Sequence, residues 1–184
     1  DKNNLIVDYE VTNDPNDKKQ LNEMAGRAKD ILEVDSLDVL ADKGYYNPDE
    51  IKKCVDNNTI PCIPEPKSKQ PTEESFPKPG FCDCDFKYEA NRDIYICPGG
   101  RDLTFSVISE KNKKVMKEYR SDSCSSCESK SRCIRNKKGR VIFRWEHEEI
   151  LEDMRQRVKD KKDVVKKRNC MCEHPFGTIK RGFN

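Results

Sequence analysis

The sequence predicts an α/β fold in which part of an open, parallel sheet is interrupted by a small β-rich segment that carries cysteines. Over the first 64 residues, short apolar runs with strand character alternate with helical patterns, which is the order that builds a parallel sheet. The interrupting segment contains six of the ten cysteines, and a helical pattern returns after Trp145. Together these features predict one α/β domain with an insertion.

The composition limits the size of the core and shows an uneven distribution of charge. Of the 184 residues 34% are hydrophobic and 38% are charged, and the mean hydropathy is −0.99, so a modest core is expected. Residues 1–50 are mainly acidic, whereas Lys111–Arg120, Arg132–Arg144 and Arg155–Arg168 are rich in Lys and Arg. This pattern favours basic surfaces for nucleic acid and carboxylates for metal, and the alternative for each run is a solvated face of mixed charge.

The first elements are expected to be a strand, a helix and a second strand. Apolar and polar residues alternate from Leu5 to Val11, the period of a strand. Helical spacing of apolar residues follows over Asp17–Leu32, with Asn16 or Asp17 as the N-cap. The apolar run at Leu37–Ala41 predicts the second strand, since it has the length and the composition of a buried strand.

A second helix and a last strand complete this part of the sheet. Asn47 offers a cap and Pro48 a first helical residue, so a short helix is expected to about Val55. Thr59–Pro64 predicts a strand at a sheet edge, because it contains prolines. Ligands of parallel sheets gather at the carboxyl ends of the strands, where Asp42 is expected. The alternative for this carboxylate is a turn or capping role.

The chain is therefore predicted to have four parts. The part after the first sheet elements is rich in Pro, Lys, Ser and Glu and predicts a linker. Within the cysteine-rich part, a hairpin is expected near residues 87–100 and short strands near 103–108 and 115–119. The predicted parts are residues 1–64 (first part of the core), 65–80 (linker), 81–144 (cysteine-rich β insertion) and 145–184 (helical last part of the core).

Four cysteines of the insertion have spacing that predicts a zinc site. Thiolates two residues apart can bind one side of a tetrahedral ion, and tight turns let backbone amides face the sulfurs. The alternatives are a disulfide pair and an iron–sulfur cluster, and Cys82 or Cys84 could substitute as a ligand. Cys54, Cys62, Cys170 and Cys172 are expected to be ordinary half-buried thiols. The predicted ligands are Cys97, Cys124, Cys127 and Cys133.

Near the end of the chain, a glutamate and a lysine could share one face of a helix. Apolar residues at helical spacing predict helices over Ile150–Val158 and onward from Val164, with basic residues outside. Pro175 disfavours helix at the preceding residue, so Glu173 is expected at a helix boundary or kink. Two turns separate Glu173 from Lys180, so the pair could offer a carboxylate to metal and an ammonium to phosphate. The alternative is a pair on a solvated surface.

In their order along the chain, several motifs resemble those of a known family, the bacterial insertion-sequence transposases of the DDE class. The members in question have a ribonuclease-H-like catalytic domain with a cysteine-containing insertion. The similar motifs lie at Leu5–Asn13, Ala41–Tyr45, Tyr95–Pro98, Cys124–Cys133, Arg144–Glu148 and Glu173–Gly177. The resemblance implies that the α/β part is a partial ribonuclease-H-like fold.

The resemblance also implies roles for individual residues. Asp42 would be the second acid of the catalytic triad and Glu173 the third, and together they would bind Mg²⁺ or Mn²⁺. The first acid would end a strand ahead of this chain, which is expected to be a piece of a longer protein, and Asp1 is the candidate within it. Residues expected to contact the DNA backbone are Lys180, Arg168 and Lys167.

The implied function is metal-dependent DNA cleavage and strand transfer during transposition, with a structural zinc ion in the insertion. The implied partners are transposon ends, target DNA and further copies of the chain on DNA. No apolar run has the length of a membrane span, so the implied location is the bacterial cytoplasm, at the nucleoid. The alternatives are a non-catalytic, zinc-stabilised nucleic-acid-binding remnant of a transposase and a plain globular scaffold with structural zinc.

Overall fold

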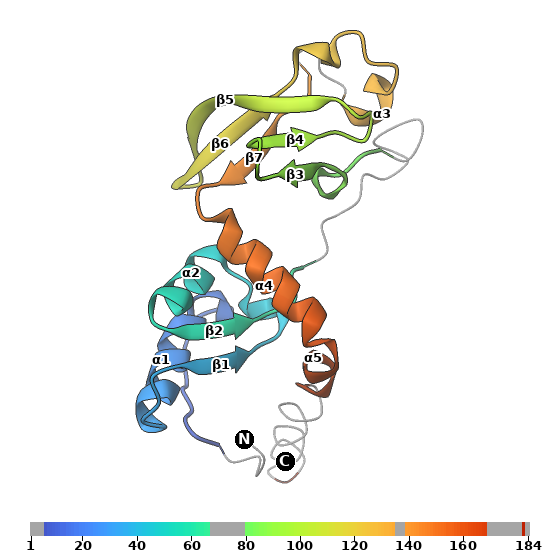
Figure 1. Cartoon of the computed structure of the whole chain (residues 1–184). Helices are drawn as coiled ribbons and strands as arrows, with labels where there is room; N and C mark the ends of the chain where they lie inside the picture. The colour runs from blue at the N-terminus through green and yellow to red at the C-terminus, as the bar shows by residue number, and fades with distance from the viewer. Residues whose placement is uncertain (1–5, 67–79, 135–138, 169–181, 183–184) are drawn as a thin grey trace. The chain divides into compact units, whose positions relative to one another are not determined.

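The structure is a computed structural model, and it describes residues 6–66, 80–134, 139–168 and 182 (Figure 1). The chain divides into two compact units. We call Asp1–Pro66 with Glu149–Asn184 the core unit, and Lys67–Glu148 the sheet unit. Among the described residues, none of the helices combines the length and apolar character that a bilayer crossing requires.

In the core unit two parallel strands lie among helices, as the sequence predicts. β1 and β2 pair in parallel, with Leu37 opposite Thr59 and Leu40 opposite Cys62. The elements of this unit are η1 (Asp17–Lys19), α1 (Leu21–Ile31), β1 (Leu37–Leu40), η2 (Lys43–Tyr45), α2 (Pro48–Asp56), β2 (Thr59–Cys62), α4 (Glu148–Asp160) and α5 (Lys162–Arg168). The first residue of α4 still belongs to the sheet unit.

Side-chain caps fix where the first helices begin. The Asn16 side chain accepts a hydrogen bond from Lys18 N at 3.2 Å, and a short 3₁₀ turn then leads into α1. Asn47 accepts from Asp49 N at 3.1 Å, and proline occupies the first turn of α2. Both caps satisfy backbone N–H groups that a helix leaves without partners. The predicted start of the second helix is confirmed, whereas Asn16 caps only the 3₁₀ turn, and α1 itself begins at Leu21.

The core of this unit is formed by residues of the helices, and by one residue just after β2, that pack around the strand pair. Ile51 of α2, Ile63 after β2 and Met154 of α4 are completely buried. Parallel strands need such cover because their faces are apolar. Cys54 and Cys62 were expected to be half-buried but are buried, and burial raises the pKa of both thiols, which makes them unreactive. Cys170 and Cys172 lie outside the described residues.

A buried carboxylate connects α1 and α2. Glu50 lies in the first turn of α2, and its Oε2 accepts a hydrogen bond from Asn22 N at 3.2 Å. Its other oxygen is 2.8 Å from Lys53 Nζ. The negative charge at the start of α1 is favourable for the helix dipole, and both carboxylate oxygens have a partner. Glu50 therefore fixes the angle at which the two helices meet.

The prediction of a strand over Leu5–Val11 is wrong for the residues of this segment that the structure describes. Residues 6–12 form no strand, and Tyr9 and Val11 are 77% and 88% exposed. A strand needs a backbone partner, and no described segment pairs with this one. Arg27 of α1 holds the segment instead, through Asp8 at 2.8 Å and Glu10 at 3.0 Å.

The sheet unit is an antiparallel sheet of five strands in chain order. β5 and β6 form a long hairpin with a bulge between Phe105 and Val107. The hairpin and the two middle strands match the prediction, whereas β7, which continues the sheet, was not predicted. The elements are η3 (Asp83–Asp85), β3 (Lys87–Glu89), β4 (Ile94–Ile96), β5 (Asp102–Lys111), β6 (Lys114–Arg120), η4 (Asp122–Cys124), α3 (Lys130–Cys133) and β7 (Ile142–Trp145).

The sheet curls, so that its first and last strands, β3 and β7, come into contact. The Arg144 guanidinium of β7 lies 3.8 Å from the ring centroid of Tyr88 in β3. The curled side encloses an aromatic core, in which Tyr95 and Tyr119 meet edge to face at 5.1 Å. Its buried members are Phe86, Tyr95, Leu103, Tyr119 and Ile142.

One carboxylate anchors the aromatic core. The hydroxyls of Tyr88 and Tyr119 both donate to Asp93 Oδ1 at 2.6 Å, and Lys117 Nζ lies 3.4 Å from Oδ2. The hydrogen bond from Tyr119 is the largest cause that lowers the pKa of Asp93. Burial, followed by the same hydrogen bond, raises the pKa of Tyr119. The network thus favours an ionised aspartate and neutral tyrosines.

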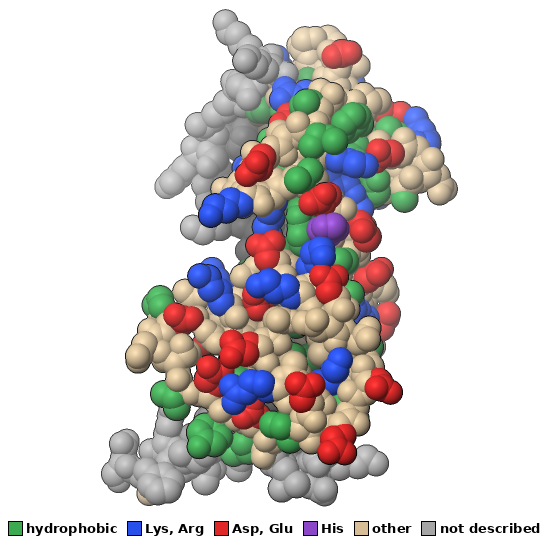
Figure 2. Space-filling view, turned by 90° about the vertical axis from the view of Figure 1, so that its left-hand side faces the viewer, with side chains coloured by type: hydrophobic (Ala, Val, Ile, Leu, Met, Phe, Trp, Pro, Cys, Tyr) green, Lys and Arg blue, Asp and Glu red, His purple; other side chains and the backbone are tan. Residues whose placement is uncertain are grey.

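The surfaces of the two units differ (Figure 2). On the visible face of the core unit, acidic and basic side chains are mixed, as expected of solvated faces. The sheet unit shows hydrophobic side chains gathered on its visible face. Large apolar residues exposed in this unit are Phe105, Val107, Ile108, Val115 and Phe143.

We predict that Tyr119→Phe lowers the free energy of unfolding by about 1 kcal/mol, because Asp93 loses a donor. The raised pKa of Tyr119 stabilises the fold fully below the unfolded tyrosine pKa of about 10, and this contribution is lost as the pH rises above it. Stability should therefore fall in alkali, and less steeply in the variant. Denaturant titration followed by the single tryptophan, Trp145, measures both effects.

The exposed Tyr9 provides the matched control, since Tyr9→Phe removes a hydroxyl from a side chain outside the core. This control should unfold like the wild type at about pH 8 and about pH 11. If Tyr119→Phe and Tyr9→Phe behave alike at both pH values, the Asp93 network does not stabilise the sheet unit.

Candidate functional site

Asp42 lies directly after the carboxyl end of β1, where the sequence predicted an acid. It is the N-cap of η2, and its Oδ1 accepts a hydrogen bond from Gly44 N at 2.6 Å. A Cβ at Gly44 would lie 2.8 Å from the same oxygen, so a larger residue there would displace the Asp42 carboxylate. The side chain is 48% exposed. The capping alternative is thus present, but it engages one carboxylate oxygen and leaves the second directed elsewhere.

The second oxygen faces a cation from a segment far away in the sequence. Nη1 of Arg168, in α5, is 3.7 Å from Asp42 Oδ2, and the arginine side chain is 17% exposed. Two contacts bring this segment to the strands, one from α4 and one from Lys161, which lies between α4 and α5. Arg157 Nη1 donates to the Pro61 carbonyl at 3.1 Å, and Lys161 Nζ lies 2.6 Å from Asp38. The packing of α4 therefore places the end of α5 at the carboxyl end of β1.

A second acid at this end of the strands was not predicted as a site residue. Glu65 follows β2, and its Oε1 accepts a hydrogen bond from the Tyr46 hydroxyl at 3.0 Å. Its Oε2 is 2.7 Å from Arg155 Nε in α4. Glu65 was predicted to lie in the linker because of its neighbours in the sequence. Its position shortly after a parallel strand was the signal that could have identified it.

Of the remaining predicted catalytic and DNA-binding residues, one is described by the structure and three are not. Lys167 is described, and it is exposed on α5 next to Arg168. Asp1, Glu173 and Lys180 lie outside the described residues. Of the predicted catalytic and DNA-binding residues, the structure therefore brings together Asp42 and Arg168.

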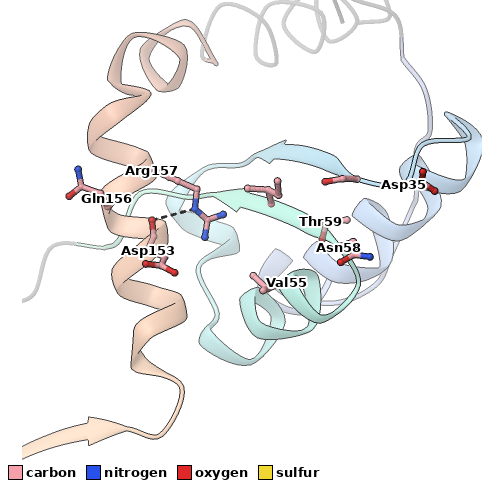
Figure 3. Close-up of a pocket in the computed structure, with 9 residues that line it drawn as sticks. Asp35, Val55, Asn58, Thr59, Asp153, Gln156 and Arg157 are labelled. Atoms are coloured by element: carbon pink, nitrogen blue, oxygen red, sulfur yellow. Dashed lines mark hydrogen bonds between the residues drawn. The ribbon is translucent and has the colours of Figure 1, made fainter. Parts of the chain in front are cut away.

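An open cleft lies at the opposite end of the strands (Figure 3). It is an open space of ≈ 760 Å³, bounded by the starts of β1 and β2 and by α4. Arg157 Nε donates to the Asp153 carbonyl at 3.3 Å beside it. The cleft contains none of the predicted site residues. Its lining residues are Asp35, Ser36, Val55, Asn58, Thr59, Ile60, Asp153, Gln156 and Arg157.

In the sheet unit, the four cysteines predicted as ligands line one small cavity. The cavity measures ≈ 30 Å³, which is room for about one water-sized atom. Phe86 and Leu103 form part of its apolar wall, and Arg101 and Arg140 also line it. All four cysteines are free thiols, so the disulfide alternative is wrong for them. They are Cys97, Cys124, Cys127 and Cys133.

The turn after Cys97 directs a backbone amide at sulfur, as the sequence predicted. Arg101 N donates to Cys97 Sγ at 3.3 Å, and Gly100 N donates to the Cys97 carbonyl at 2.8 Å. Gly100 has a φ of 72°, a conformation that glycine adopts without strain. An N–H that faces sulfur stabilises a thiolate, which is the form that binds metal.

The other three predicted ligands all come from the segment 124–133. Burial raises the pKa of the Cys133 thiol, while the nearby charge of Arg140 opposes this shift. The other three cysteines also raise it, which shows that the four groups are neighbours. No three of their sulfurs lie within 4.8 Å of one another among the described residues. A zinc tetrahedron, with sulfurs about 3.8 Å apart, would require these side chains to move closer together.

Cys82 and Cys84 are joined to each other by a disulfide and do not line the cavity. They were predicted as possible substitutes for a ligand of the zinc site. Their place in the η3 turn directs both sulfurs to each other instead.

A comparison with protein families identifies the last part of the chain. A family described as the transposase DDE domain matches residues 96–184. The matched segment, a little under half of the chain, is similar to this domain and supports a DDE-class transposase. No curated protein and no solved structure matches the chain.

The transposase match supports the DDE class of transposases that the motifs resemble. It includes β5, β6, β7, α4 and α5, and it therefore contains the four cysteines of the cavity and Arg168. It also includes Glu173 and Lys180, whereas Asp42 precedes it. The mixture of helices with a curled antiparallel sheet is compatible with a DDE-class α/β domain.

We predict that Gly139→Ala destabilises the cysteine cavity. Gly139 has a φ of 90°, and a Cβ there would lie 2.8 Å from Cys124 Cβ. The substitution should lower the free energy of unfolding by about 1–3 kcal/mol, because the backbone is strained and Cys124 must shift. Gly99→Ala is the control, since its Cβ would lie at an ordinary 3.6 Å from Cys97 Sγ. Equal unfolding midpoints for the two variants would show that the loop does not constrain Cys124.

Proposed function

We propose that this chain is part of the catalytic domain of a bacterial insertion-sequence transposase, which cleaves DNA strands and transfers them to a target. The observation that carries the proposal is the meeting of Asp42 and Arg168. A carboxylate at the end of a parallel strand and a guanidinium from the DDE-class segment lie 3.7 Å apart. An acid for metal and a cation for phosphate are the groups that phosphodiester chemistry needs together.

In this proposal Asp42 and Glu173 hold Mg²⁺ or Mn²⁺, and Asp1 is the candidate for the first acid. The Asp42 carboxylate fits a hard cation, since it is nearly half exposed and one oxygen is outside the η2 cap. The metal ions would activate the attacking hydroxyl and stabilise the leaving oxygen. The main role of Asp42 is to hold this charge at a fixed place, because Gly44 N orients its carboxylate.

The basic residues of the same region are proposed to bind the DNA backbone. Arg168 can make two parallel hydrogen bonds to a phosphate held beside Asp42. Lys167 is exposed next to it, and Lys180 follows Glu173 in the sequence. Such contacts position the strand without reading its bases. The proposed partners are therefore transposon ends and target DNA, with further copies of the chain assembled on them in the cytoplasm, at the nucleoid.

We further propose that the four-cysteine cavity binds one structural Zn²⁺. Four free thiols and an amide directed at one sulfur fit this ion, and the apolar wall excludes water from it. The ion would join the turn after Cys97 to the segment 124–133, which supplies the other three ligands. It would thus stabilise the sheet unit, which is proposed to position transposon-end DNA.

A second candidate function is that of a zinc-stabilised, non-catalytic DNA-binding remnant. The extent of the family match favours it, because residues 96–184 include the cysteines and the basic helices but exclude Asp42. Such a protein would bind DNA with an affinity that falls steeply with salt, and it would not cleave. Binding that does not depend on salt would instead favour a globular scaffold.

The proposal predicts that the complete protein nicks transposon-end DNA only with Mg²⁺ or Mn²⁺. Asp42→Asn and Glu173→Gln should each lower the cleavage rate by on the order of 100-fold or more, since a metal ligand is lost. Asp56→Asn is the control in the same unit, because Asp56 pairs with Lys52 within α2 and is more than half exposed. Its cleavage rate should remain close to that of the wild type.

Single-turnover cleavage and DNA binding should be measured on the same preparations. Loss of cleavage with binding retained supports a catalytic role for Asp42 and Glu173. Cleavage that survives both substitutions would refute it, and metal-independent binding without any cleavage by the wild type would favour the remnant.

For the cysteine cavity we predict one zinc ion per chain by elemental analysis. Cys97→Ser or Cys124→Ser should lower the zinc content to near zero and destabilise the sheet unit, as a chelator should. Cys54→Ala is the control, because Cys54 is a buried free thiol of the core unit. Iron in place of zinc would indicate the iron–sulfur alternative, and the absence of both metals would refute the site.

A further inference from the structure

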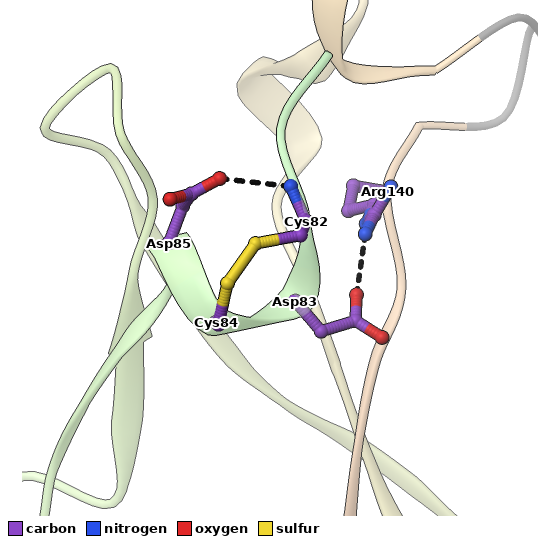
Figure 4. The surroundings of a disulfide bond; sticks show 5 residues. All are labelled: Cys82, Asp83, Cys84, Asp85 and Arg140. Atoms are coloured by element: carbon purple, nitrogen blue, oxygen red, sulfur yellow. Dashed lines mark hydrogen bonds and ion pairs between the residues drawn. A yellow bond between two sulfur atoms is a disulfide. The ribbon is translucent and has the colours of Figure 1, made fainter. Parts of the chain in front are cut away.

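A cluster of three potential metal ligands lies outside the four-cysteine cavity (Figure 4). The sulfurs of Cys82 and Cys84 and a carboxylate oxygen of Asp85 all lie within 4.8 Å of one another. Cys82 is buried, whereas Cys84 and Asp85 are exposed, so the cluster can be reached from solvent. In the structure the two sulfurs form a disulfide.

The convergence of the three groups does not depend on the sulfur–sulfur bond. η3 turns the chain so that Asp85 N donates to the Cys82 carbonyl at 3.1 Å. In return, Cys82 N donates to Asp85 Oδ2 at 2.8 Å. These reciprocal hydrogen bonds hold the first and last ligand together. The turn would therefore keep its shape if the disulfide were opened.

An ion pair fixes the same turn to the rest of the sheet unit. Asp83, between the two cysteines, pairs with Arg140. Arg140 also donates to the Cys133 carbonyl at 3.1 Å and lies over the Phe86 ring at 5.3 Å. The ligand cluster is thus built on a turn that is anchored from outside.

We propose that Cys82, Cys84 and Asp85 form a second, redox-controlled site for one thiophilic divalent cation of the zinc type. Two thiolates and one carboxylate suit zinc or cadmium, whereas magnesium and calcium prefer oxygen alone. Three protein ligands leave a fourth position for water. The site goes beyond the proposed catalytic function, and it is distinct from the four-cysteine cavity, whose lining excludes Cys82 and Cys84.

The redox step determines whether the site exists. Opening the disulfide takes two electrons and two protons and yields two thiols. A phosphine supplies the electrons and becomes a phosphine oxide, whose oxygen comes from water. The cation then displaces both thiol protons and binds the thiolates. In the reverse direction, a hydroperoxide accepts the two electrons together with two protons from the solvent, the S–S bond forms, an alcohol and water leave, and the cation is released.

Titration of the full chain with Cd²⁺ tests the proposal, because thiolate-to-cadmium charge transfer absorbs in the ultraviolet. The phosphine-reduced wild type should bind one more Cd²⁺ than the reduced double variant Cys82→Ser/Cys84→Ser. The peroxide-treated wild type, with the disulfide verified by mass spectrometry, should match that variant. Asp85→Asn should weaken the additional site by about 10-fold or more, since an anionic ligand is lost.

The outcomes separate this site from the four-cysteine cavity. The double variant Cys97→Ser/Cys124→Ser should lose the Cd²⁺ ion that binds in the four-cysteine cavity and keep the Cd²⁺ ion that binds at Cys82, Cys84 and Asp85. Equal Cd²⁺ stoichiometry for the reduced wild type and Cys82→Ser/Cys84→Ser would overturn the proposal. The comparison of reduced with oxidised wild type needs no variant, so equal binding there would overturn it even if a variant fails to fold.

Discussion

The candidate site depends on one packing interaction, that of α4 on the parallel pair β1 and β2. Parallel strands are stable only when their apolar faces are covered, and Met154 of α4 is completely buried in the core unit. The cover comes from a part of the chain that the sheet unit separates from the strands. Arg157 and Lys161 then bind the strands at Pro61 and Asp38. The requirement to cover the strands thus brings Arg168 to Asp42.

The same arrangement explains why an insertion is tolerated between the strands and α4. The sheet unit has its own aromatic core and its own sheet, and residues of the core unit are part of neither. A core of this size supplies limited stability, and small domains commonly add a metal or a disulfide. The sheet unit has the groups for both, namely the four-cysteine cavity and the Cys82–Cys84 disulfide.

Local signals in the sequence predicted most of the core unit. The caps at Asn16 and Asn47 and the apolar runs of β1 and β2 are local, and the structure confirms them. The strand at Leu5–Val11 was wrong because alternation shows only that a segment could pair, and no described segment pairs with it. β7 was missed because a strand of four residues carries little pattern, and its partner β6 determines its conformation.

For the sites, the spacing of residues along the sequence predicted which side chains gather in one cavity, but it did not predict which residues from distant segments meet. The four cysteines share a cavity as their spacing predicts, because turns at Cys97 and near Cys127 are local. In contrast, the pairs Asp42–Arg168, Tyr46–Glu65 and Glu65–Arg155 join segments that only tertiary packing brings together. No local pattern could identify these pairs. The sequence therefore predicted the acid at the strand end but not the residues around it.

The central claim is that Asp42 and Glu173 share one divalent-ion site, and metal-directed cleavage of the protein backbone tests it most directly. Fe²⁺ replaces Mg²⁺ in such sites, and with ascorbate and peroxide it cuts the chain near its ligands. If the two acids share a site, the chain should be cut close to both Asp42 and Glu173, and excess Mg²⁺ should suppress both cuts together. Cuts near the cysteines should not be suppressed by Mg²⁺. Mg²⁺-sensitive cuts near one of these acids alone, or near neither, would contradict it.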